Sequence, residues 1–191
     1  MILTIHQPNF FPWYPFFQKV KSADKFVFLN HSQYQKNYLQ NRFSYEDRWF
    51  TMSVNKGLDP ITTKKYLNPE KDWNSIKNKL PQFKDVFPLF DDCISESLVD
   101  TNMRIITKIS NILEIKTELL LDYETDLTST DRLVDICLHF GADTYLSGIS
   151  GKNYLEMKKF EDKNIKVIFQ DEKEMIKNPI LDLLKNKLQN V

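Results

Sequence analysis

The chain has 191 residues, 41% of them hydrophobic and 27% charged, a composition that favours one well-filled core and argues against wholesale disorder. Its 26 basic and 26 acidic side chains give a formal net charge of zero, so overall charge recruits neither nucleic acid nor an anionic membrane surface. The two cysteines, Cys93 and Cys137, are far apart, which argues against a zinc site or a disulfide framework and favours buried thiols.

The beginning of the chain, MILTIHQPNF, lacks a basic segment followed by a long apolar stretch. Nowhere do about eighteen apolar residues follow one another, the length that a membrane-spanning helix needs. We therefore expect no signal peptide, no membrane span and a cytoplasmic location. The length favours a single domain over residues 1–191.

The chain opens with the pattern of a strand, a loop and a helix, followed by a second strand. Residues 2–6 form a short apolar run, typical of a buried strand in a parallel sheet. Pro12 and Pro15 lie where a helix could begin, because proline is tolerated in the first turn. Residues 25–29, KFVFL, predict the second buried strand, and a polar loop follows it directly.

A small antiparallel insertion is predicted next. Residues 49–54 are rich in strand-forming side chains, and Gly57 marks a turn before residues 61–67. We therefore expect a hairpin around residues 49–67. The pattern from about residue 73 to residue 113 is helical.

The last third of the chain alternates strands with helices. Residues 117–123 predict a strand, and Thr128 with Asp131 fits a capping box at the start of a helix that ends at Gly141. The remaining predicted elements are strands at 144–146 and 166–169, a helix around 154–160 and a helical tail from residue 178. This alternation predicts an α/β fold, in which a mostly parallel open sheet carries helices on both faces.

Three polar loops follow predicted strands, at residues 6–9, 33–42 and 147–151. In open α/β sheets, ligands bind outside the carboxyl ends of the strands, where loops and helix N-termini converge. We therefore expect the three loops to meet on one rim and to form one pocket for a small-molecule substrate.

His6 ends the first predicted strand. There it could act as a catalytic acid or base or hydrogen-bond a substrate oxygen, and the alternative is a histidine that only ties the loop to the backbone. Gln7 and Asn9 beside it can orient a bound amide, sugar or base. Trp13 could form an aromatic wall for such a ligand, although core packing is the commoner use of this side chain.

Residues 33–42 combine amides, aromatic rings and cations, which suits a loop that binds sugars or nucleotides and also suits a plain surface loop. Arg42 is the best anion partner, because a guanidinium can grip a phosphate with two hydrogen bonds, and Lys36 is the second. The substrate-binding residues predicted in this segment are Gln33, Tyr34, Lys36, Asn41 and Arg42.

The motif SGISG at residues 147–151 has two glycines that allow backbone N–H groups to approach a phosphate or carboxylate, and a following helix would add its dipole. A tight turn is the alternative, because the spacing matches neither a Walker nor a Rossmann motif. The predicted phosphate-binding residues are Ser147, Gly148, Ser150 and Gly151. The three histidines lack metal-binding spacing, so no metal site is expected, and the sequence names no cofactor.

Four segments together resemble the WbqC-like family: IHQPNFFPW at 5–13, ADKFVFLNHSQYQKNYLQNR at 23–42, WFTMSV at 49–54 and GADTYLSGISGKNYL at 141–155. The resemblance implies a role in building O-antigen (lipopolysaccharide), capsule or related surface polysaccharides. It marks residues in the same three loops, namely His6, Gln7, Pro8, Trp13, Gln33, Tyr34, Asn41, Arg42, Ser147, Gly148, Ser150 and Gly151.

The chain also departs from the family pattern. Pro15 stands where the family usually has glycine, and Asn30 where it usually has aspartate. After Gln170 the chain lacks the aromatic, His-Pro tail that is common in relatives. If that tail lines the site, this protein differs in substrate or lacks part of the activity.

The leading hypothesis is a transferase or ligase that modifies a glycan precursor, acting on a nucleotide-linked sugar with His6 as acid or base. The first alternative is a non-catalytic sugar-binding or scaffold protein, whose protein partner is a glycan-assembly enzyme or a second copy of the chain. The second alternative is an ATP-dependent, carboxylate-activating enzyme similar to nucleotidyltransferases, although their HxGH signature is missing here.

Overall fold

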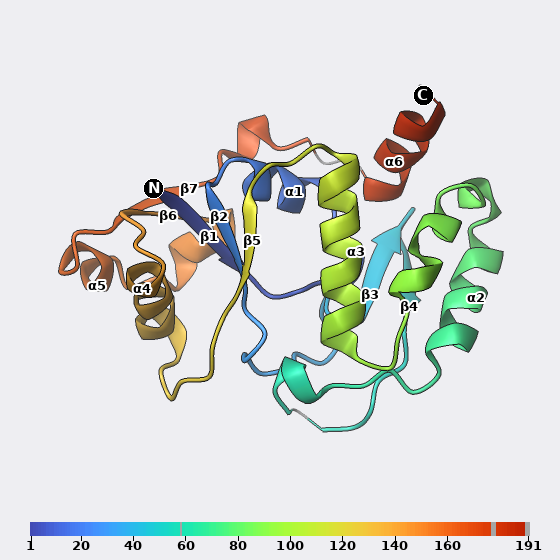
Figure 1. The fold of residues 1–191 in the computed structure, drawn as a ribbon, viewed down its shortest axis with the longest axis horizontal. Helices are drawn as coiled ribbons and strands as arrows, with labels where there is room; N and C mark the ends of the chain where they lie inside the picture. The colour runs from blue at the N-terminus through green and yellow to red at the C-terminus, as the bar shows by residue number, and fades with distance from the viewer. Residues whose placement is uncertain (58, 177–178, 190–191) are drawn as a thin grey trace.

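The computed structural model describes residues 1–57, 59–176 and 179–189. Five parallel strands form one open sheet in the order β5-β2-β1-β6-β7 (Figure 1). The strands are β1 Ile2–His6, β2 Lys25–Phe28, β5 Glu118–Leu121, β6 Thr144–Ser147 and β7 Lys166–Phe169. The strand order reverses between β1 and β6, as in doubly wound folds. The predicted α/β sheet is confirmed.

Helices cover both faces of the sheet because the strand side chains alternate between two apolar clusters. On one face, Phe26 and Phe28 pack with α1 Tyr14–Lys21 and α3 Leu98–Ile112. On the other face, Leu3 and Ile5 pack with α4 Ser129–His139 and α5 Met157–Glu161. The two layers of helices predicted from the alternation of elements are therefore present (Figure 1).

An antiparallel hairpin lies beside the sheet, and its strands are β3 Arg42–Tyr45 and β4 Arg48–Thr51. The hairpin itself is confirmed, but β4 pairs with the segment before it and not with residues 61–67. Residues 61–63 form a short 3-10 helix, η1 Ile61–Thr63, and Tyr66 makes an isolated antiparallel bridge to Val54. The turn between β3 and β4 has positive φ at both Glu46 and Asp47, a conformation that normally calls for Asn or Gly.

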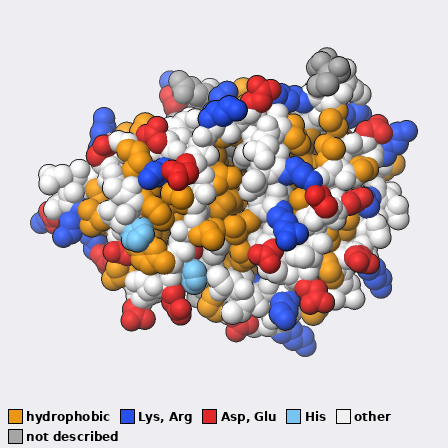
Figure 2. Space-filling model, viewed as in Figure 1, with side chains coloured by type: hydrophobic (Ala, Val, Ile, Leu, Met, Phe, Trp, Pro, Cys, Tyr) orange, Lys and Arg blue, Asp and Glu red, His pale blue; other side chains and the backbone are white. Residues whose placement is uncertain are grey.

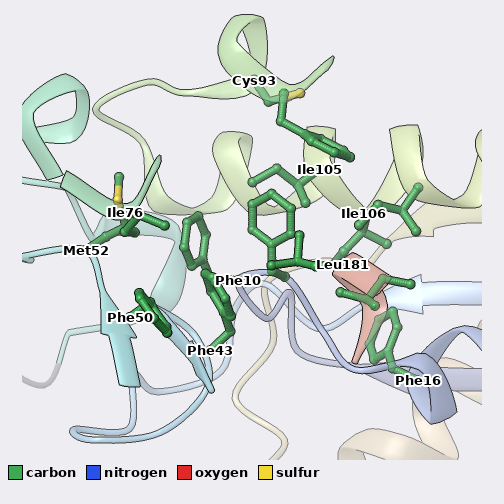
Figure 3. Close-up of a cluster of buried hydrophobic side chains, with 14 of the residues drawn as sticks. Phe10, Phe16, Phe43, Phe50, Met52, Ile76, Cys93, Ile105, Ile106 and Leu181 are labelled. Carbon is green, nitrogen blue, oxygen red and sulfur yellow. The ribbon is translucent and has the colours of Figure 1, made fainter. Parts of the chain in front are cut away.

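The cluster on the α1 and α3 face continues into the hairpin and makes one apolar core with it (Figure 3). Phe11 stacks on Trp73 with 5.6 Å between ring centroids, and Phe43 stacks on Phe50 at 5.4 Å. The remaining helices around this core are α2 Pro69–Lys79, η2 Pro81–Phe83, η3 Phe87–Cys93 and α6 Ile180–Gln189. The two further short helices are η4 Ile149–Asn153 and η5 Glu172–Glu174.

The start of α4 differs from the prediction, whereas its end agrees with it. Thr128 is the residue before the helix but makes no side-chain cap, so the predicted capping box is absent. Asp131 is instead engaged by Lys159, whose Nζ lies 2.8 Å from the carboxylate. Gly141 has φ +71°, the left-handed conformation expected after the helix.

Charged side chains are mixed over the surface. On the face shown in Figure 2, Lys and Arg are interspersed with Asp and Glu, as the balanced composition leads one to expect. Among the described residues, no helix is both long enough and apolar enough to cross a bilayer.

Candidate functional site

A cavity of about 990 Å³ lies at the C-terminal ends of the sheet strands. His6 and Gln7 line it from the end of β1 and residues 31–35 from the loop after β2. The loop after β5 contributes Thr125, Leu127 and Thr128, and the segment after β6 contributes Ser150. Ligand sites of doubly wound sheets lie at this edge, and the volume matches that of small-molecule pockets. This cavity is the candidate site.

Five of the thirteen predicted site residues line this cavity: His6, Gln7, Gln33, Tyr34 and Ser150. The amide of Gln7 connects two loops, because its Nε2 donates to Ser32 Oγ at 2.9 Å and its Oε1 accepts from Gln40 Nε2 at 2.6 Å. Gln7 therefore holds the rim in shape as well as facing the cavity.

Two predicted residues at the start of the hairpin have structural partners. Asn41 is buried, accepts a hydrogen bond from Tyr34 Oη at 2.9 Å and donates to Met52 O at 2.7 Å. The guanidinium of Arg42 lies 4.0 Å from the ring centroid of Trp49 and donates to Asn37 O. Neither residue lines the cavity, because β3 leads the chain away from the sheet rim.

The other three predicted binding residues of the first two loops also lie outside the cavity lining. Trp13 lines a separate, mainly apolar cavity of about 280 Å³, where Phe10 and Leu181 are neighbours. Asn9 is 3% exposed, and its Oδ1 has no hydrogen-bond partner among the described residues. Lys36 is exposed.

The SGISG motif forms a tight turn. β6 ends at Ser147 and the five-residue 3-10 helix η4 follows, so the predicted helix, α5, begins only at Met157, six residues after Gly151. Ser147 is 1% exposed and donates from Oγ to Gly148 O at 3.1 Å. A Cβ on Gly151 would overlap Ser147 Oγ, whereas a Cβ on Gly148 would meet nothing nearer than Gln170 Oε1 at 3.9 Å. Packing therefore explains one of the two glycines.

Gly151→Ala is expected to lower the free energy of unfolding by about 1–3 kcal/mol, because the added methyl group must displace a buried serine. Gly148→Ala, in the same turn, serves as the matched control and should change stability by less than about 0.5 kcal/mol. The double variant Ser147→Gly/Gly151→Ala should recover part of the loss. Urea denaturation measures all three, and equal stabilities of the two single variants would contradict this account of the turn.

His6 is a neutral group in this structure. Its Nδ1 lies 2.9 Å from Gln7 O, so the ring donates there and Nε2 carries the lone pair. Burial and, to a smaller extent, the charge of the neighbouring Lys19 together lower the pKa of His6 to about 3. Because a weak base takes a proton poorly at neutral pH, His6 suits a hydrogen-bonding role better than the acid–base role expected from its position.

Lys19 is a buried amine that sequence reasoning missed. It is 4% exposed on the face of α1 that packs against the sheet, and its Nζ donates to Ile5 O at 3.4 Å. Burial lowers the pKa of Lys19 to about 7. Its apolar neighbours Phe16, Phe17 and Val20 give the only sequence signal, namely a lysine on an apolar helix face.

A second set of functional candidates, His31, Asp122 and Arg132, was also missed. The Asp122 carboxylate follows β5 and is completely buried. Its Oδ1 lies 2.8 Å from His31 Nδ1, and its Oδ2 lies 2.6 Å from Arg132 Nη2. His31 and Arg132 line the cavity. The available signal was an acidic residue directly after the apolar run at 119–121, where a parallel strand ends.

The lining of the cavity mixes polar and apolar side chains and is nearly uncharged. Among the described residues that line it, Arg132 is the single Lys or Arg, and no Asp or Glu is present. Arg132 forms an ion pair with Asp122, which does not itself line the cavity. Amides, hydroxyls and two exposed tyrosine rings, Tyr38 and Tyr154, make up much of the surface. Within the described chain, no cluster of three His, Cys, Asp or Glu residues could hold a metal ion.

Comparisons with known proteins add a family. The WbqC-like protein family matches residues 7–179 of this chain. The uncharacterized protein Rv1507c of Mycobacterium tuberculosis (strain ATCC 25618 / H37Rv) is 26% identical over 188 residues, which cover 88% of this chain and 81% of that protein. No solved structure is significantly similar. The matched region includes every residue that lines the cavity except Ile5 and His6.

Proposed function

The chain belongs to the WbqC-like protein family, and on that premise we propose that it is a transferase or ligase that modifies the sugar of a nucleotide-linked glycan precursor in surface-polysaccharide biosynthesis. The observation that carries the proposal is the cavity at the C-terminal edge of the sheet, whose lining combines polar groups with apolar and aromatic surface and is nearly uncharged. Sugars present hydroxyls and amides to such amide and hydroxyl groups, and their apolar faces pack on aromatic rings.

The charge of the lining indicates which part of the precursor lies in the cavity. A diphosphate needs cations or clusters of free N–H groups, and the one guanidinium in the lining is held by Asp122. The sugar is therefore the part that we assign to the cavity. The same reasoning disfavours ATP-dependent carboxylate activation, because a triphosphate would place still more negative charge there.

The cysteines support a cytoplasmic setting for this reaction. Both are free and buried, and burial raises the pKa of Cys93 to about 11 and that of Cys137 to about 12, so both are protonated at neutral pH. Free thiols without a disulfide are usual in a reducing compartment.

A thermal-shift screen tests the proposal. We expect a UDP-, dTDP-, GDP- or CMP-linked sugar to raise the melting temperature, because a ligand at 100 times its Kd stabilises a protein by about 2.7 kcal/mol. The same nucleotide without its sugar should have little effect. Incubation of the stabilising compound with acetyl-coenzyme A or a second sugar nucleotide, followed by mass spectrometry, then tests for a modified product.

Two tryptophan variants on η4 provide the matched comparison. Ser150→Trp places a large ring in the cavity lining and should weaken or abolish the thermal shift, whereas Asn153→Trp, at an exposed position outside the lining, should retain it. Binding without any product would favour the sugar-binding or scaffold role. No shift with any sugar nucleotide, or an undiminished shift in Ser150→Trp, would refute the proposal.

A further inference from the structure

We propose that His31 is the general base of the cavity and that Asp122, itself held by Arg132, is the residue that positions it. This assignment rests on the proposed function, because it names the group that would activate the bound sugar. It differs from the sequence-based expectation, which gave the acid–base role to His6.

The geometry fixes the tautomer of His31. A carboxylate only accepts hydrogen bonds, so the 2.8 Å contact from His31 Nδ1 to Asp122 Oδ1 requires the proton on Nδ1. In the neutral ring the lone pair then lies on Nε2, which makes no hydrogen bond to any residue that the structure describes. The side chain is 31% exposed and lines the cavity, so a ligand can reach it.

Asp122 is equipped to support a protonated imidazole. Its oxygens also accept the backbone N–H groups of Asn30 at 3.0 Å and His31 at 3.2 Å, and Arg132 supplies a compensating charge at 2.6 Å. The carboxylate is thus fixed in place before any reaction occurs. When Nε2 takes a proton, the resulting imidazolium lies against this carboxylate, the arrangement that orients and stabilises histidine bases in enzymes.

Anchoring of the loop does not by itself account for the imidazole. The two backbone N–H bonds to Asp122 already hold residues 30 and 31, and any residue except proline at position 31 would supply one of them. The other two histidines are less suitable as a base. His6 has a pKa of about 3, and His139 lies on α4 against Tyr123, outside the cavity lining.

The reaction step follows from these positions. A hydroxyl or amine of the bound sugar gives its proton to His31 Nε2 while its oxygen or nitrogen forms a bond to the electrophilic carbon of an activated acyl or glycosyl donor. The bond from that carbon to the leaving group breaks, and the leaving group departs with the electron pair. The imidazolium then returns the proton to the leaving group, so His31 regains its neutral form.

The first experiment needs no turnover. Long-range ¹H–¹⁵N correlation spectra of the ¹⁵N-labelled protein report the tautomer of each histidine. We expect His31 to be the Nδ1–H tautomer, with a lone-pair chemical shift at Nε2 that moves when a stabilising sugar nucleotide from the thermal-shift screen is added. An Nε2–H tautomer would overturn the assignment.

The second experiment compares His31→Gln with His139→Gln. Glutamine can still donate a hydrogen bond to Asp122, so folding and the thermal shift should be retained, whereas turnover should fall about 100-fold or more and the acidic limb of its pH profile should disappear. His139→Gln should behave like wild type. Wild-type turnover in His31→Gln overturns this assignment alone, whereas failure of every sugar nucleotide to bind overturns the proposed function and this assignment with it.

Discussion

Asp122→Ala is expected to lower the free energy of unfolding by about 3–5 kcal/mol, because it leaves a buried guanidinium without its counter-charge. The Arg132 side chain is 8% exposed and that of Asp122 is fully buried, so water can replace the lost partner only in part. The backbone N–H groups of Asn30 and His31 lose their acceptor as well. Urea denaturation at neutral pH measures the loss.

A neighbouring ion pair gives the control. Asp131 lies 2.8 Å from Lys159, but its side chain is 53% exposed, so Asp131→Ala should cost less than about 1 kcal/mol. The double variant Asp122→Ala/Arg132→Met removes both buried charges and should be more stable than Asp122→Ala. If Asp122→Ala costs no more than Asp131→Ala, the buried pair does not hold the loops around the cavity as described.

The sheet could be predicted from sequence because its signals are local. Residues 2–6, 25–29 and 166–169 are short apolar runs, and each forms the strand expected of it or nearly so. Gly141 marks the end of α4 through its own backbone conformation. The pairing of β4 with β3 was missed because the turn between them has positive φ at Glu46 and Asp47, a conformation that these residue types rarely adopt.

The candidate site was less predictable, because loop direction and long-range pairing decide its composition. Arg42 follows a polar loop at the correct edge, but it begins β3 and is carried toward Trp49. Asp122 becomes a candidate only through its contacts with Arg132 in the next helix and with His31, 91 residues earlier in the chain. The rule that sites lie at strand C-termini found the edge of the sheet, and tertiary pairing determined which residues face the cavity there.

His6 is expected to make the protein sensitive to acid. The pKa of His6 is about 3 in the folded protein and 6.5 in the unfolded chain. Between these two pH values the unfolded chain therefore binds a proton that the folded protein does not. The contribution of His6 to the free energy of unfolding is therefore fully present above pH 6.5 and is lost as the pH falls toward 3. One pH unit within this window corresponds to about 1.4 kcal/mol, and because the ring is only partly buried we expect a loss of about 2 kcal/mol from pH 7 to pH 4.5.

His6→Gln isolates this effect. Carboxylates with lowered pKa values, such as Asp91, also weaken folding in acid, but they contribute equally to wild type and variant and cancel in the difference. The gap in unfolding free energy between wild type and His6→Gln should therefore shift by about 2 kcal/mol in favour of the variant between pH 7 and pH 4.5. His139→Gln should show no such shift. A constant gap would mean that His6 takes up a proton in the folded protein, and the acid–base role first expected for it would regain support.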